Sequence, residues 1–271
     1  MRVRWATWNL WSIGPGWTER GERAGALLTE LDADVVCLQE VRRDARHDVG
    51  ATIADRLGLH ITRCAPVSAE WWSGRVGEQI EVDNVVLSRW PVSEAVAQVL
   101  PHEGAGEERR SALHVRIEAP SPLRVVSTQL TSSPLDSRLR VAQVRALAAE
   151  LARRRRPDES VLVAGDMNAE PDSDEMRLVC GHKTAPPVPG HVLMDLWRFA
   201  AAGSPGDTWD RCNPHVEASN EPSCRIDYLL AAPMPSGRLP HVAAIERFGA
   251  HPVNGVWASD HAGVVATIEL G

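Results

Sequence analysis

Short apolar runs, bounded by polar or turn-forming residues, recur along the chain and predict strands. The runs are rich in valine, leucine and isoleucine, as in DVVCLQE and SVLVAGD, and this composition is typical of strands. Strands in such number predict a layered sheet protein. The runs cover residues 3–9, 34–40, 84–90, 112–118, 123–130, 160–166, 225–231 and 263–270.

Three longer stretches between these runs repeat their apolar residues at helical spacing and predict amphipathic helices over 19–31, 45–57 and 137–155. Asp136 is placed to cap the longest of these helices, and Pro157 ends it. Helices alternate with strands early in the chain, whereas later strands follow one another directly. This order favours an α/β sandwich with the sheets inside and the helices outside. The apolar face of the longest helix consists of Leu139, Val141, Val144, Leu147, Ala148 and Leu151.

The chain of 271 residues shows no internal repeat and no low-complexity linker. The segments 181–190 and 217–223 have the composition of surface loops and do not mark a boundary between domains. Layered folds of this length exist as one domain. We therefore expect a single domain over residues 1–271.

Composition and charge exclude several classes of protein. The chain is 44% hydrophobic and 24% charged, as in an ordinary globular domain, and no apolar run reaches the roughly 18 residues of a membrane span. The N-terminal MRVRWATWNLW lacks a signal-peptide core, so we expect a cytoplasmic protein. A net charge of −7 disfavours a protein that coats nucleic acid, but not one that meets phosphate through bound cations. The basic run 153–156 is interpreted as a solvated helix end.

The five cysteines form no CxxC pair, which disfavours a zinc site. Cys37 lies within an apolar run and is expected in the core. Cys212 and Cys224 bracket a short loop, so a disulfide between them remains an alternative.

Side chains able to bind metal or transfer protons follow or interrupt five of the strand-like runs. A carboxylate at the end of a buried strand is costly unless a partner compensates it, and several together repel one another unless a cation lies between them. Turn formation or capping accounts for any one of them, but not for all five. The residues are Asn9, Glu40, Asp166 with Asn168, Asp227, and Asp260 with His261.

The oxygen-rich character of this set indicates the metal. Asp166 and Asn168 are two residues apart, so their side chains leave an extended chain on the same face. Gly165 lets the backbone approach whatever they hold. Because oxygen ligands without cysteine or paired histidine suit hard cations, Mg²⁺ is predicted, with Mn²⁺ as the alternative.

His261 differs in context from the other histidines. It follows Asp260 directly, and Asp227 is available to fix its tautomer or stabilise its charged form. An imidazole beside a cation is suited to hold a phosphoryl oxygen as charge develops on it. We assign structural or exposed positions to His47 and His60, and to His102.

A set of short motifs, in this order along the chain, resembles the endonuclease/exonuclease/phosphatase superfamily, whose fold is that of deoxyribonuclease I. The resemblance runs nearly end to end. It implies a four-layer α/β/β/α sandwich of two packed, mostly antiparallel sheets flanked by helices, and Mg²⁺-dependent hydrolysis of a phosphoester. The motifs are TWN (7–9), LQE (38–40), NVVLSRWP (84–91), GDMNAEPDS (165–173), TWD (208–210), RIDYLL (225–230) and SDH (259–261).

The resemblance also implies metal ligands. Glu40 would be the main ligand, with Asn9 and Asp260 nearby. Bound metal lowers the pKa of its water and offsets charge on the phosphoryl oxygens.

The remaining family roles fall on residues around the reacting phosphate. Asp166 would orient or deprotonate the attacking water, assisted by Asn168. His261, oriented by Asp227, would bind the scissile phosphate and stabilise the transition state. Asn84 and Arg225 would help to shape the pocket.

One position departs from the family pattern. Many members carry histidine in a THL segment where this chain reads STQL, which places Gln129 there. Glutamine can donate a hydrogen bond to a phosphate oxygen, but it cannot deliver a proton, a form of help worth ~100- to 10,000-fold. Either water on the metal supplies the proton, or the substrate has a good leaving group such as a phosphate or phenolate.

The superfamily spans nucleases, sphingomyelinases and inositol-phosphate phosphatases, and its shared motifs do not separate them. Trp71 and Trp72, in a loop-like context, could stack on a base or lie against lipid, as could Trp90, and Trp209 is expected at the mouth of the site. No basic stripe with interleaved aromatic residues is present. The leading expectation is a small or specialised phosphoester. A DNA or RNA nuclease and a catalytically silent binding protein are the alternatives, and the oligomeric state stays open.

Overall fold

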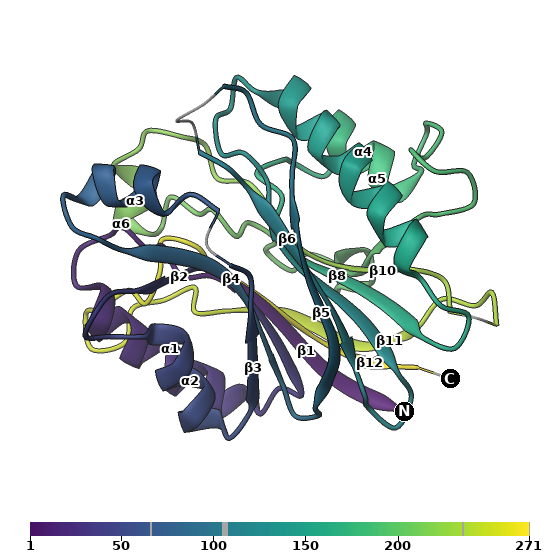
Figure 1. Ribbon diagram of the computed structural model, residues 1–271, viewed down its shortest axis with the longest axis horizontal. Coiled ribbons are helices and arrows are strands. Elements are labelled where there is room, and N and C mark those ends of the chain that lie inside the picture. The colour runs from purple at the N-terminus through teal and green to yellow at the C-terminus, as the bar shows by residue number, and fades with distance from the viewer. Residues whose placement is uncertain (66, 105–107, 235, 271) are drawn as a thin grey trace.

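The computed structural model describes residues 1–65, 67–104, 108–234 and 236–270. Two six-stranded sheets pack face to face in the middle of the molecule, and helices cover both outer faces (Figure 1). The predicted four-layer α/β/β/α sandwich is thereby confirmed.

Each sheet combines strands from distant parts of the chain. The first has the order β11-β12-β1-β2-β4-β3 and the second β5-β6-β7-β8-β10-β9. Only β1 with β2 and β7 with β8 are parallel among the paired strands of the described residues. The strands are β1 (Arg2–Asn9), β2 (Val35–Arg43), β3 (His60–Arg63), β4 (Glu81–Ser88), β5 (Val92–Val99), β6 (Ser111–Ile117), β7 (Leu123–Gln129), β8 (Ser160–Asp166), β9 (Met194–Asp195), β10 (Asp227–Ala231), β11 (His241–Phe248) and β12 (Gly263–Glu269).

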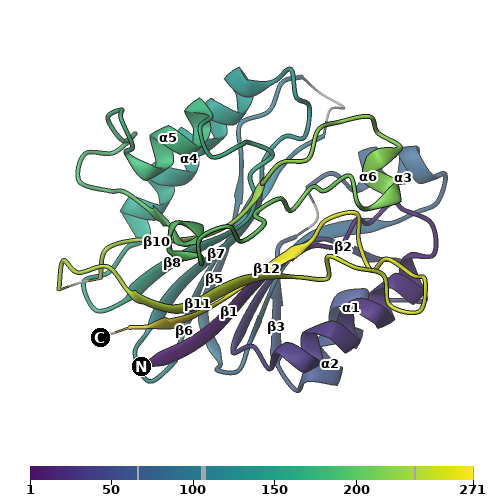
Figure 2. The same ribbon diagram turned by 180° about the vertical axis from the view of Figure 1, so that it is seen from behind.

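The helices lie on opposite outer faces. Two of them, α1 and α2, cover the sheet that contains β1, and α4 and α5 cover the sheet that contains β8 (Figures 1 and 2). The helices are α1 (Trp17–Leu31), α2 (Val49–Leu57), α3 (Ala69–Val76), α4 (Ser137–Arg154), α5 (Asp174–Cys180) and α6 (Pro214–Glu217), with a 3₁₀ turn η1 (Leu196–Phe199).

Three apolar clusters hold the layers together. The largest fills the space between the sheets and includes Trp5, Val115 and Leu229, each buried. A second lies under α4 and α5, and a third lies under α1 and α2. Burial of this much apolar surface is the main force that fixes the two sheets against each other.

The structure corrects several local predictions. The second helix begins at Val49, because the Asp48 side chain accepts a hydrogen bond from Ala51 N at 2.9 Å and caps it there. Asp136 does occupy the N-cap of α4, but its side chain makes no capping hydrogen bond.

Two further predictions concern tryptophan and cysteine. The segment that contains Trp71 and Trp72 is helical, as part of α3, and not a loop. All five cysteines, which lie within the described residues, are free, so the Cys212–Cys224 disulfide is absent.

No helix among the described residues combines the length and apolar character that crossing a membrane requires.

Candidate active site

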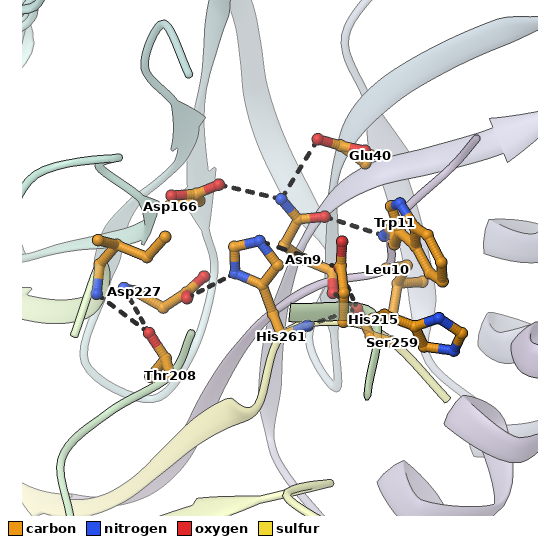
Figure 3. Close-up of polar contacts among 12 residues, drawn as sticks. Asn9, Leu10, Trp11, Glu40, Asp166, Thr208, His215, Asp227, Ser259 and His261 are labelled. Atoms are coloured by element: carbon orange, nitrogen blue, oxygen red, sulfur yellow. Dashed lines mark hydrogen bonds and ion pairs between the residues drawn. The ribbon is translucent and has the colours of Figure 1, made fainter. Parts of the chain in front are cut away.

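Strand ends from both sheets meet at one end of the sandwich. Asp166 ends β8, where it pairs in register with Gln129 at the end of β7 and with Asp227 at the start of β10. Asn9 ends β1 in the other sheet, and its Nδ2 donates a hydrogen bond to Asp166 Oδ2 at 3.0 Å (Figure 3). The predicted strand-end residues are therefore neighbours in space.

A β-bulge places Glu40 in this group. The register between β2 and β4 shifts between Leu38 and Val41, and Glu40 itself has φ +53°. Positive φ is uncommon for a residue with a side chain and marks a locally constrained backbone. Gln39, the other residue of the bulge, donates from Nε2 to Ser127 Oγ at 3.0 Å across the two sheets.

Gly165 and Asn168 shape the chain around Asp166. Gly165 has φ +148°, and a Cβ there would lie 1.8 Å from the backbone oxygen of Thr128, so no other residue fits. Asn168, with φ +46°, donates from its backbone N to Asp166 Oδ1 at 2.9 Å and from Nδ2 to Asp166 Oδ2 at 3.2 Å. The absence of a side chain at Gly165 is what lets β8 lie this close to the Thr128 backbone of β7.

Asp227 and His261 form a buried pair beside Asp166. The distance from His261 Nδ1 to Asp227 Oδ2 is 2.8 Å, and the backbone N of Asp227 donates to Thr208 Oγ1 at 3.0 Å (Figure 3). The Trp209 ring packs edge-on against the imidazole, with centroids 5.0 Å apart. One ligand atom each from Asp166, Asp227 and His261 lie within 4.8 Å of one another.

Two amide side chains link the carboxylates of Glu40 and Asp166, and a third amide contacts Asp166 alone. Asn9 Nδ2 donates to both, to Glu40 Oε1 at 3.4 Å, and Gln129 Nε2 also donates to both, at 2.7 Å and 3.2 Å respectively. Asn168 contributes the third amide. Because an amide nitrogen carries two N–H groups, both donors of Gln129 are engaged by protein carboxylates.

Burial and neighbouring charges raise the pKa values of two site carboxylates and lower that of a third. Burial, with the neighbouring charge of Asp227, raises the pKa of Asp166 to about 6. Burial likewise raises the pKa of Asp260 to about 7, against the charge of His261. Burial alone would raise the pKa of Glu40, but the Arg110 charge and the Gln129 hydrogen bond outweigh it and leave the pKa below its usual value.

The pKa of His261 lies well above its usual value. Burial alone would lower this pKa, but the charge of Asp227 and the hydrogen bond to Asp227 raise it by more. This shift favours the charged imidazole, in which both ring nitrogens are hydrogen-bond donors.

Several of these residues face a cleft of about 630 Å³. Glu40, Asp166 and His261 line its floor, with Gln129 and Asp260. One wall carries Trp71 and Arg75 of α3, where the Arg75 guanidinium lies 4.7 Å from the Trp71 ring centroid. The segment from Thr131 to Pro134 and the side chain of Trp209 complete the walls.

Two predicted pocket residues lie outside the lining of this cleft. Asn84 is buried and donates to Ser111 O at 2.8 Å. Arg225 pairs with Asp195, at 2.8 Å between Nη2 and Oδ2, and its guanidinium stacks 4.5 Å from the Tyr228 ring centroid. Both side chains support neighbouring strands, and a contact with substrate stays a prediction.

Sequence reasoning missed two residues that contact Glu40 or Gln129. Ser12 donates from both N and Oγ to Glu40 Oε2 at 3.2 Å. Arg110, which is buried, donates from Nη1 to Gln129 Oε1. Ser12 follows the predicted site residue Asn9 by three residues, and this proximity could have marked it as a site residue. By contrast, nothing in the sequence distinguishes Arg110 from Arg109.

The donor set fits a divalent cation. Asp260 is buried beside Glu40, whose charge adds to the rise of its pKa. Among the described residues its carboxylate accepts one hydrogen bond, from Ser259 Oγ at 3.2 Å, and lies 4.0 Å from His261 Nε2. These contacts leave its pKa raised, so a bound cation would stabilise the buried charge further. Oxygen donors from Glu40 and Asp260 match the preference of a hard cation.

Comparison with known proteins gives a family and a fold. The family model for the endonuclease/exonuclease/phosphatase family matches residues 6–261. An endonuclease/exonuclease/phosphatase from Beutenbergia cavernae is 26% identical, with a TM-score of 0.71 over 100% of this chain and 72% of that chain. No curated protein matches the chain.

Two further structures are similar over their full length. D. rerio TDP2 complexed with single strand DNA product is 18% identical, with a TM-score of 0.76 over 99% of each chain. An endonuclease/exonuclease/phosphatase from Bacteroides vulgatus is also 18% identical, with a TM-score of 0.76 over 100% of each chain. At this identity the likeness establishes the fold alone.

Proposed function

Because the chain belongs to the endonuclease/exonuclease/phosphatase family and is a metal-dependent phosphoester hydrolase, we propose that it hydrolyses a small or specialised phosphodiester with Mg²⁺. The observation that carries this proposal is the juxtaposition of Asp166 and His261 on the floor of the cleft, with Asp227 buried behind His261. This arrangement combines a proton acceptor with a cationic donor for a phosphoryl oxygen.

Asp166 is the group proposed to orient the attacking water and to accept its proton. A carboxylate whose pKa is about 6 is ionised at neutral pH yet basic enough to share a proton. Its Oδ2 is held by Asn9, Gln129 and Asn168, and its Oδ1 accepts the backbone hydrogen bond of Asn168. These bonds hold the carboxylate in one orientation.

His261 is proposed to bind the scissile phosphate. Nδ1 is engaged by Asp227, so Nε2–H is the ring donor that can reach a phosphoryl oxygen. The positive charge on the imidazole opposes the negative charge that builds up on that oxygen in the transition state. Asp227 keeps the ring charged and in one orientation.

Glu40 and Asp260, with Asn9 beside them, are the residues proposed to hold the metal. When bound there, Mg²⁺ would lower the pKa of water and offset charge on the phosphoryl oxygens. The amides that contact Glu40 keep its carboxylate in place.

The charge of the cleft favours a small substrate over a long nucleic acid. Among the described residues that line it, seven carboxylates face two cationic side chains, those of Arg75 and His261. A polyanion would be repelled at each additional phosphate, whereas one phosphodiester needs a favourable site for a single charge. The carboxylates are Glu40, Glu103, Glu108, Asp136, Asp166, Glu221 and Asp260.

The test compares phosphodiesters at equal phosphate concentration. Initial rates are measured for bis(p-nitrophenyl) phosphate, glycerophosphoglycerol, p-nitrophenyl phosphate and a single-stranded oligonucleotide, with Mg²⁺, with Mn²⁺ and with EDTA. We expect metal-dependent hydrolysis of the small diesters and slower cleavage of the oligonucleotide. A faster rate on the oligonucleotide would establish the nuclease alternative, and no turnover of any substrate would favour a silent binding protein.

Variants connect the activity to the site. We expect Asp166→Asn and His261→Ala to lose ~100- to 10,000-fold in kcat with the fold retained. Asp172→Asn is the matched control, because Asp172 is an exposed carboxylate six residues along the same segment. Circular dichroism confirms folding in each case. Full activity in Asp166→Asn or His261→Ala would contradict the assigned roles.

A further inference from the structure

Gln129 occupies the centre of the site but has no N–H group left for a substrate. Its Nε2 donates to Glu40 Oε1 at 2.7 Å and to Asp166 Oδ2 at 3.2 Å, and its side chain is buried. The earlier prediction that it contacts a phosphate oxygen is not what these bonds support. Gln129 instead links a proposed metal ligand to the proposed proton acceptor.

The orientation of the Gln129 amide decides whether this link attracts or repels. With Nε2 facing the carboxylates both contacts are hydrogen bonds, but with Oε1 facing them three oxygens would crowd together. Oε1 accepts a hydrogen bond from Arg110 Nη1, and a guanidinium carries donors alone. Arg110 therefore selects the productive orientation.

Arg110 is itself held in place by Glu108, which lines the cleft, and by the Trp72 ring. It is buried, and its Nη2 lies 2.8 Å from Glu108 Oε1. Its guanidinium lies 5.8 Å from the ring centroid of Trp72 in α3. Arg110 does not belong to the residues that line the cleft, within the described part of the chain. Its charge lowers the pKa of Glu40, and its hydrogen bond to Gln129 Oε1 is the contact through which it can orient the site.

We propose that Arg110 is a positioning residue, which fixes the Gln129 amide so that Gln129 holds Glu40 and Asp166 at the spacing that metal binding and catalysis require. This inference rests on the proposed function, because it assigns Glu40 to the metal. Groups that orient the ligands of a metal contribute about 10- to 100-fold to metal affinity or activity.

The experiment measures Mg²⁺ affinity by isothermal titration calorimetry, together with kcat and KM on bis(p-nitrophenyl) phosphate. We expect Arg110→Met to weaken Mg²⁺ binding about tenfold or more and to lower kcat, with KM for the substrate unchanged. Arg110→Lys keeps one donor and the charge, so it should recover part of both losses. Gln129→Met should reproduce the effect of Arg110→Met.

A double-mutant cycle tests the route of action. If Arg110 acts through Gln129, the double variant Arg110→Lys/Gln129→Met, which keeps the positive charge near Glu40, will bind Mg²⁺ no more weakly than Gln129→Met alone. Independent action would give additive losses and would overturn the proposal. Should Arg110→Met fail to fold, the Arg110→Lys and Gln129→Met measurements decide the matter.

Arg124→Met is the matched control. Arg124 is a buried arginine of β7, the strand that pairs with the β6 strand directly after Arg110. It is paired with Glu159 at 3.0 Å and is absent from the cleft lining among the described residues. It should lose stability yet keep the Mg²⁺ affinity of the wild type. The proposal is overturned if Arg110→Met behaves like Arg124→Met. By contrast, a wild-type protein that fails to bind Mg²⁺ would refute the proposed function itself.

Discussion

Asp260→Asn should stabilise the metal-free protein at alkaline pH while it removes metal binding. Asp260 is buried, and its pKa in the folded protein is raised from 3.8 to about 7, first by burial and then by the charge of Glu40. The folded state therefore binds a proton more tightly than the unfolded state. Stability from this group is complete below pH 3.8 and is lost as the pH rises through 7.

The magnitude follows from the size of the shift. A difference of about three pKa units corresponds to about 4 kcal/mol of unfolding free energy, which the metal-free wild type lacks at pH 8. Asparagine is neutral at every pH and similar in shape to a protonated aspartic acid. In EDTA the variant should thus exceed the wild type by about 4 kcal/mol at pH 8, and by about 2 kcal/mol at pH 5.

Urea unfolding in EDTA at the two pH values measures this difference. Asp172→Asn serves as the control and should stay within about 0.5 kcal/mol of the wild type at both. Mg²⁺ at 100 times its Kd should then stabilise the wild type by about 2.7 kcal/mol and the Asp260→Asn variant by less. The reasoning is refuted if Asp260→Asn is the less stable protein at pH 8 in EDTA, or if the difference does not change with pH.

Two further predictions concern the Asp227–His261 pair and the close approach of β8 to β7 at Gly165. Asp227→Asn should lower kcat ~100- to 10,000-fold. It should also shift the alkaline limb of the pH–kcat profile to lower pH, because the pKa of His261 falls without the neighbouring charge, and an unchanged profile would contradict this. Gly165→Ala should cost about 3 kcal/mol or more in urea unfolding, since its Cβ would lie 1.8 Å from Thr128 O. Gly190→Ala, with φ +77° and open space, separates backbone strain from the clash, and equal losses in the two variants would argue against the clash.

The strands that the sequence predicts are the inner strands of both sheets. The four that it missed are the four edges: β11 and β3 in one sheet, β5 and β9 in the other. An edge strand has one neighbour and is less buried, so its composition carries a weaker signal; β5 alternates between exposed and half-buried residues throughout. Pairing with a distant strand fixes such segments, and that pairing cannot be read from local composition.

The missed helices have a related explanation. The helices α3, α5 and α6 have eight, seven and four residues, and helices this short are marginal in isolation. Tertiary contacts hold them, as in α3, where Trp72 is buried and Arg110 lies over its ring. Because a turn of helix carries little periodicity, Trp71 and Trp72 had the sequence pattern of a loop.

The chemistry of the site was predictable because its residues interrupt apolar runs, whereas their contacts were not. The bulge that carries Glu40 depends on the register of β2 against β4, which no pattern in LQEVRR indicates. The same holds for Arg110, whose role is visible only beside Gln129. The residue types at a strand end indicate which chemistry they can support, whereas the fold determines which neighbouring side chains orient them.

The amide network also indicates that a metal bound as proposed would affect stability through Asp260 more than through the other carboxylates. Glu40 is ionised at little cost, because donors from Asn9, Gln129 and Ser12 surround it and its pKa lies below the usual value. Asp166 has donors on both oxygens and a pKa of about 6. Asp260 accepts one hydrogen bond among the described residues and lies 4.0 Å from His261 Nε2, and its pKa of about 7 is the highest of the three. A cation that binds between Glu40 and Asp260 would therefore gain most of its coupling to folding from Asp260, and that coupling grows as the pH rises.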